Sequence, residues 1–67
     1  MITTGLDLKL ERTAQRVTAR SIARVMGITS GRIGHVEASA FVTHEMATRY
    51  RAALATCVET RTSGTLA

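Results

Sequence analysis

The 67-residue chain has no proline and no tryptophan, and its only aromatic residues are one tyrosine and one phenylalanine. It has a single cysteine, so no disulfide can form within the chain, which fits a reducing cytoplasm. No stretch approaches the roughly 18 consecutive apolar residues that span a membrane. The opening residues lack the basic and apolar regions of a secretory signal, so we expect a cytoplasmic protein.

The chain has little material for a catalytic centre. Hydrophobic residues make up 45% of the sequence, which is enough for one small core but not for the walls of an enclosed substrate site. We find no Ser/His/Asp set on a suitable scaffold and no glycine-rich phosphate loop. The spacing of His35, His44 and Cys57 matches no metal site. We therefore expect one small soluble domain that is not an enzyme, takes no small-molecule substrate and needs no metal or cofactor.

Acidic residues are absent from a long central stretch of a chain whose net charge is +4. Between residues 12 and 36 there is no Asp or Glu, and the basic residues and histidine of this window are Arg12, Arg16, Arg20, Arg24, Arg32 and His35. Phosphate attracts such residues whatever the base sequence, so the pattern favours nucleic acid as a partner. An ordinary solubilising surface would produce a similar charge, and a GC-rich genome would favour Arg codons, so both of these causes stay open.

The missing proline and the lack of alternating apolar segments predict an all-α domain with four helices, or five. The expected helices cover residues 4–15, 18–27, 30–37 and 44–57, and a loop fills 38–42. Gly27 would end the second helix in a left-handed conformation. The residues suited to begin the four helices as N-caps are Thr4, Thr18, Thr29 and Thr43. The domain would span 1–58, followed by a mobile tail at 59–67 that has no apolar periodicity.

The apolar positions assign an inward face to each expected helix. The first helix would bury Leu6 and Leu10, with Leu8 widening the stripe. Phe41 would turn inward and anchor the loop. The inward positions of the other three helices would be Ile22, Ala23, Val25, Met26, Ile33, Val36, Met46, Tyr50, Ala53, Leu54 and Cys57.

The stretch from Val17 to Glu37, VTARSIARVMGITSGRIGHVE, carries the most information. It resembles the helix-turn-helix of the phage Cro and repressor (XRE-like) family, whose pattern reads Leu-Thr-Gln-x-x-Leu-Ala-x-x-Leu-Gly-Val-Ser-x-x-x-Ile-x-x-Ile-Glu. Eleven of the 21 positions agree in register without a gap, namely Val17, Thr18, Ile22, Ala23, Met26, Gly27, Ile28, Thr29, Ile33, Val36 and Glu37. The resemblance implies a compact repressor-like domain with its helix-turn-helix at 18–37.

The shared positions also have physical reasons. Ala23 is small where the two helices would cross, and Gly27 adopts a positive φ without steric cost. Ile28 and Ile33 would close the core between the helices. Thr29 would cap the helix whose N-terminus faces DNA.

Arg12 stands where family members carry an Arg that pairs with the Glu matching Glu37. The resemblance therefore implies an Arg12–Glu37 salt bridge between the first helix and the end of the third. The alternative is two exposed, unpaired charges, which would contribute at most about 1 kcal/mol if they met.

The chain departs from the family pattern at two places. Ala19 replaces the Gln that usually contacts a phosphate, and Ala38 stands where Gly often follows the final Glu. Arg16 and Arg20 are the neighbours that would supply the missing phosphate contact.

In this family the first turn of the recognition helix and one later position face the major groove. With Arg16 and Arg20 as the substitutes for the missing contact, the predicted DNA-binding residues are Arg16, Thr18, Arg20, Thr29, Ser30, Gly31, Arg32, Gly34 and His35. Arg32 would bind guanine O6 and N7 or clamp a phosphate, and the sequence leaves both roles open. His35 would donate to a base or a phosphate, or be a surface residue without a role.

Gly31 and Gly34 are unusual inside a helix, where each costs about 1 kcal/mol relative to Ala. Three causes are open: close approach to DNA, a soft helix that orders on binding, and tight packing against a neighbouring helix. Close approach to DNA is favoured over tight packing, because neither glycine lies on the face of Ile33 and Val36.

The resemblance implies a sequence-specific regulator that binds double-stranded DNA, most similar to a small Cro-like phage repressor that blocks polymerase at an operator. Family members commonly bind as homodimers to half-sites about 34 Å apart, and dimerisation only on DNA is also open. The candidate dimer residues are Phe41, Val42, Tyr50 and Val58. The alternatives are an antitoxin or excisionase-like accessory protein, and an anti-repressor module that binds protein instead of DNA.

Overall fold

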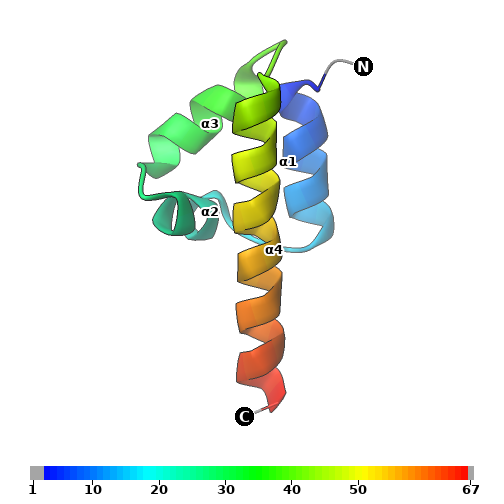
Figure 1. The fold of residues 1–67 in the computed structure, drawn as a ribbon, viewed down its shortest axis with the longest axis vertical. Helices are drawn as coiled ribbons and strands as arrows, with labels where there is room; N and C mark the ends of the chain where they lie inside the picture. The colour runs from blue at the N-terminus through cyan, green and yellow to red at the C-terminus, as the bar shows by residue number, and fades with distance from the viewer. Residues whose placement is uncertain (1–2, 67) are drawn as a thin grey trace.

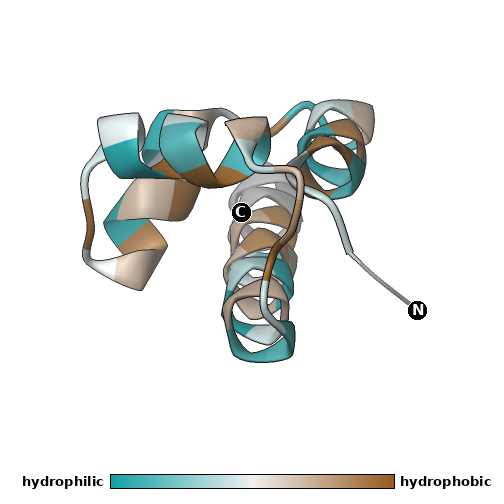
Figure 2. Ribbon diagram, turned by 90° about the horizontal axis from the view of Figure 1, so that it is seen from above, coloured by the Kyte–Doolittle hydropathy of each residue, from teal (hydrophilic) through white to brown (hydrophobic). Residues whose placement is uncertain are grey.

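The computed structural model describes the backbone of residues 3–66 and the side chains of residues 3–60. Within that range the chain forms four α-helices and no strand: α1 (Gly5–Ala14), α2 (Ala19–Met26), α3 (Ser30–Ala38) and α4 (His44–Leu66). The long α4 has α1 on one side and the α2–α3 pair on the other, as Figure 1 and Figure 2 show from two directions. The expected all-α, four-helix fold is confirmed.

Threonine caps every helix, as predicted. In each case the side-chain oxygen accepts a hydrogen bond from the backbone N–H three residues later, at 3.1–3.2 Å, and the capping residues are Thr4, Thr18, Thr29 and Thr43. Asp7 returns a bond from its carboxylate to the Thr4 N–H at 3.0 Å, which completes a capping box. These local bonds set where each helix begins before any tertiary packing is considered.

The core lies where α4 faces the other three helices. Its four fully buried large side chains are Leu8, Ile22, Ile33 and Tyr50, one from each helix. The predicted inward positions of α2, α3 and α4 are buried or half-buried, except Val25, whose exposed fraction is 46%. Ala47, which the pattern did not single out, is buried as well.

The inward face of α1 differs from the prediction. Leu6 and Leu10 are 58% and 57% exposed, whereas Leu8 is fully buried. The cause is Gly5, which packs against the end of α3 so closely that a Cβ on it would lie 2.2 Å from the carbonyl oxygen of Val36. This contact fixes the rotation of α1 about its axis and turns the expected stripe to solvent.

The loop between α3 and α4 also places its apolar residues differently from the prediction. Val42 donates from its backbone N–H to the Thr3 carbonyl at 2.9 Å, in an isolated antiparallel bridge. The Val42 side chain enters the core, and the preceding Phe41 is 61% exposed. Successive side chains on extended backbone point to opposite sides, so Val42 and not Phe41 anchors the loop.

The fourth helix is longer than predicted. It was expected to end near residue 57, but it continues to Leu66, so residues 59–66 are helical and not a tail without regular structure. No proline interrupts this stretch, and the single glycine in it costs a helix only about 1 kcal/mol. Figure 1 shows this end of α4 extending past the other helices.

Gly5→Ala should lower the free energy of unfolding by about 1–3 kcal/mol, because the new methyl group would push α1 away from the end of α3. Each kcal/mol corresponds to a fall of roughly 4–8 °C in the melting temperature of a domain of this size, measured by circular dichroism. Alanine normally stabilises a helix relative to glycine, so an unchanged or raised melting temperature would contradict the close contact.

Candidate nucleic-acid interface

The connection between α2 and α3 consists of residues 27–29. Gly27 ends α2 with a left-handed φ of 73°, and its N–H donates to the carbonyls of Ala23 and Arg24. The Ile28 N–H donates to the Ala23 carbonyl as well, at 3.0 Å. Thr29 then begins α3, which leaves at an angle to α2 and does not continue it as one rod (Figure 1). The predicted pair of helices joined by a glycine turn is present.

Small and branched side chains hold α2 and α3 together. Ala23 on α2 and Ile33 on α3 are buried, and Ile28 of the turn packs half-buried against the same core. Val36, almost one turn after Ile33, is buried too. The apolar side chains of α3 thus anchor it on one side and leave the other side to solvent.

The outer side of α3 carries those of the predicted DNA-binding positions that lie within this helix. The exposed residues there are Ser30, Gly31, Arg32, Gly34 and His35. Arg32 and His35 are three residues apart and therefore share one side of the helix. Within the described chain, neither side chain makes a hydrogen bond or an ion pair. Both side chains are free to contact another molecule.

The two glycines of α3 border open space. A Cβ on Gly34 would meet nothing within 4 Å, and a Cβ on Gly31 would have only the Thr29 hydroxyl oxygen at 4.0 Å. Tight packing against a neighbouring helix is therefore excluded as the reason for these glycines. Close approach to DNA and ordering on binding both stay predictions.

Three further candidates lie just before α2 and in its first turn. Arg16 and Arg20 are exposed, and so is Thr18, whose hydroxyl oxygen accepts the Ser21 N–H bond that caps α2. Arg16 has a φ of 57° and is the one non-glycine residue with positive φ in the described chain. This conformation belongs to a Schellman motif that ends α1, in which the Arg16 N–H donates to the Thr13 carbonyl at 3.0 Å and the Val17 N–H to the Arg12 carbonyl at 3.2 Å.

No carboxylate neutralises this part of the surface. The two ion pairs within the described side chains are Arg12–Glu37 and Arg51–Glu11, and both lie elsewhere. The arginines of the acid-free window that have no ionic partner in the described chain are Arg16, Arg20, Arg24 and Arg32. They give the α2–α3 side of the domain a positive potential.

Arg12 belongs to the same acid-free window, but its side chain is held inside the domain by hydrogen bonds. Its Nε donates to Glu37 Oε2 at 2.7 Å, its Nη2 to Glu37 Oε1 at 3.0 Å, and its Nη1 to the Val17 carbonyl at 2.9 Å. The hydroxyl of Tyr50 donates to Glu37 Oε2 as well. The Arg12 and Glu37 side chains are only 13% and 7% exposed. The predicted salt bridge is confirmed, and Arg12 has a structural role.

The pKa values of this cluster follow from burial and hydrogen bonding. Burial opposes ionisation of the Glu37 carboxyl, but the bonds from Arg12 and Tyr50 outweigh it and hold the pKa below the ordinary 4.5. Burial, together with the bond to Glu37, raises the pKa of Tyr50 far above its ordinary 10.0. The lowered carboxyl pKa stabilises the fold above about pH 4.5, and the raised tyrosine pKa stabilises it below about pH 10. Stability from the cluster is lost outside that window.

The structure removes two of the four dimer candidates. Tyr50, which was assigned both to the inward face and to the dimer candidates, is fully buried, and Val42 is 6% exposed. Val58 is half-buried against the core, and Phe41 is 61% exposed. The sequence pattern did not reveal the role of Tyr50, although a buried tyrosine generally needs a partner for its hydroxyl and Glu37 offers a carboxylate nearby.

Residues 3–60 contain no group of three His, Cys, Asp or Glu side chains that could hold a metal ion. In the described part of the chain, none of the helices combines the length and the apolar character needed to cross a bilayer. Comparisons with protein-family profiles, with curated proteins and with solved structures find no match for this chain.

Glu37→Ala should lower the free energy of unfolding by about 2–4 kcal/mol, because Arg12 and Tyr50 would both lose their partner in a half-buried site. Glu11→Ala is the matched control. Glu11 also pairs with an arginine of another helix, Arg51 at 2.8 Å, but those side chains are 39% and 48% exposed. Its loss should cost at most about 1 kcal/mol. Chemical unfolding measures both, and equal effects would contradict a special role for the Glu37 cluster.

Proposed function

We propose that this protein is a sequence-specific regulator that binds double-stranded DNA, without catalysis and without a cofactor. The observation that carries the proposal is the outer side of α3, where Arg32 and His35 are exposed and without partners in the described chain. In this proposal α3 enters the major groove of an operator and the bound protein blocks polymerase, as the resemblance to Cro-type repressors implies.

The dimensions of α3 support entry into the groove. An α-helix is about 10–12 Å across with its side chains, and the major groove of B-DNA is about 12 Å wide, so α3 fits it. The N-terminus capped by Thr29 offers free backbone N–H groups and the positive end of the helix dipole to a phosphate. Gly31 and Gly34 add no side chain to the outer surface, so the backbone can approach the base edges closely.

The candidate residues divide into two roles. Arg32 reads a base pair, because its guanidinium fork matches O6 and N7 of guanine, and His35 contacts a base or phosphate one turn later. Arg16 and Arg20 flank the α2 N-terminus, where an arginine restores the phosphate contact that Ala19 does not provide.

Binding as a homodimer would use a surface that the monomer leaves uncovered. Of the residues predicted for such a contact, Phe41 is exposed and lies in the loop directly after α3. Two copies joined near this loop would hold their α3 helices in a fixed relation, which is what binding to two half-sites requires.

Arg32→Ala should weaken binding to a preferred duplex by about 1–3 kcal/mol and relax the base preference at one position. Lys9→Ala, which removes one exposed charge from α1, is the matched control. Fluorescence anisotropy on a panel of duplexes measures both variants. Equal weakening on every duplex, with a salt slope smaller by about 0.9, would make Arg32 a phosphate contact. An effect no larger than that of Lys9→Ala would exclude Arg32 from the interface.

Gly34→Ala should raise the free energy of unfolding by about 1 kcal/mol, because alanine favours helix and its Cβ meets nothing. The same methyl group would stand between α3 and the base edges, so duplex binding should weaken. Thermal unfolding and anisotropy on the same variant test both effects. Unchanged binding would contradict close approach, and tighter binding would favour a helix that orders on DNA.

A further inference from the structure

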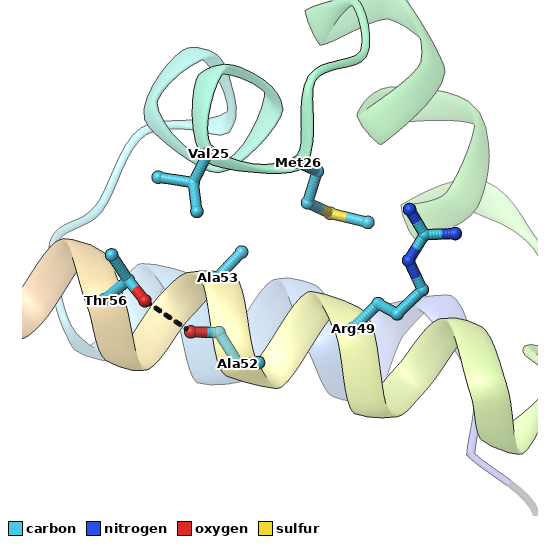
Figure 3. Close-up of a pocket in the computed structure, with 6 residues that line it drawn as sticks. All are labelled: Val25, Met26, Arg49, Ala52, Ala53 and Thr56. Carbon is cyan, nitrogen blue, oxygen red and sulfur yellow. Dashed lines mark hydrogen bonds between the residues drawn. The ribbon is translucent and has the colours of Figure 1, made fainter.

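A groove runs along the boundary between α2 and α4, away from the outer side of α3. It consists of two adjoining hollows of about 270 Å³ each that share Val25. The first is lined by Val25, Met26, Arg49, Ala52, Ala53 and Thr56, and is drawn in Figure 3. The second continues toward the C-terminal half of α4 and is lined by Ser21, Arg24, Val25, Cys57 and Thr60.

The floor of the groove is apolar because small residues of α4 face larger ones of α2. In Figure 3, Val25 and Met26 extend from α2 toward α4, where Ala53 leaves the space between the helices unfilled. Val25 is 46% exposed, and among the apolar residues predicted inward on α2 it is the one that the described part of the chain leaves uncovered. Thr56 directs its hydroxyl to the Ala52 carbonyl at 3.0 Å, so that group is already satisfied.

The rim of the groove is positively charged. Arg49 rises from α4 beside Met26, and Arg24 borders the second hollow from α2. Both arginines are exposed, and neither guanidinium has a hydrogen bond or an ion pair in the described chain. No described Asp or Glu lines either hollow. The hollow between α1 and α4 is different, since it contains Glu11, Glu59 and Arg51.

We propose that this groove binds an acidic amphipathic segment of another protein, with apolar side chains over Val25 and Ala53 and carboxylates paired with Arg24 and Arg49. Charge complementarity selects this occupant, because an apolar floor between unpaired arginines is matched by apolar residues flanked by acids. A second copy placed groove to groove would bring arginines against arginines. A DNA backbone would leave the apolar floor uncovered.

The groove and the outer side of α3 share no residue. None of the DNA-reading candidates on α3 lines either hollow. A protein partner that contacts only the residues lining the groove therefore leaves Arg32 and His35 exposed.

The test uses a fluorescein-labelled helical peptide of about 15 residues with Leu on one face and Glu on both flanks, and the same peptide with Lys in place of Glu. We expect the Glu peptide to bind and to shift the backbone amide NMR signals of Val25, Ala52 and Thr56, and the Lys peptide not to bind. Arg49→Glu should weaken binding at least about tenfold. Lys9→Glu, an identical charge change on an exposed residue of α1, should weaken it by less than about threefold.

Several outcomes would overturn the proposal. These are no binding of the Glu peptide, equal binding of the Lys peptide, and amide shifts confined to Leu6, Leu10 or Phe41. If Arg49→Glu lowers the affinity for duplex DNA more than Lys9→Glu does, and leaves the affinity for the Glu peptide unchanged, Arg49 contacts DNA and not a protein partner. If Arg49→Glu abolishes self-association measured by sedimentation, the occupant is a second copy. Circular dichroism of each variant establishes that it is folded.

Discussion

The carboxylate of Glu37 joins three helices, and the orientation of α3 depends on it. It receives two bonds from Arg12 of α1 and one from Tyr50 of α4, in a site where its side chain is 7% exposed. Because Glu37 lies near the end of α3, these bonds fix the rotation of α3 about its axis. That rotation buries Ile33 and Val36 and leaves Arg32 and His35 on the outside. The exposed side of the helix is thus a consequence of how its buried end is held.

The Glu37 cluster and the α2–α3 surface differ in how much they contribute to the stability of the domain. Around Glu37 every polar group has a partner, and within the described side chains no buried nitrogen or oxygen atom lacks one. On the α2–α3 surface, by contrast, arginines have no ionic partner in the described chain, and two glycines of α3 stand where alanine would fit. Each of these features reduces stability, and together they leave charge and space for a ligand. The proposed function rests on this contrast.

Much of the fold could be predicted from local sequence, because the capping threonines, the Gly27 turn and the inward side of α3 depend on neighbouring residues. The Arg12–Glu37 pair came from the family resemblance. The features that were missed depend on contacts between residues distant in sequence. Gly5 packs against the end of α3, Val42 donates a backbone hydrogen bond to residue 3, and the Tyr50 hydroxyl donates to Glu37. The inward face of α1 could have been predicted. Residues 5, 8 and 12 share one side of a helix, so an Arg12 that points inward to Glu37 places Gly5 and Leu8 inward and Leu6 and Leu10 outward. The α2–α4 groove could not be predicted from the sequence, because no local pattern shows that Val25 stays exposed after the helices pack.

The most direct test of the central claim, that the outer side of α3 recognises DNA, is a selection of bound sites from a pool of random duplexes. The proposed function predicts that one short motif is enriched, that it contains guanine, and that its affinity falls steeply as salt rises. Recovery of no common motif, together with affinity that does not change with salt, would contradict it.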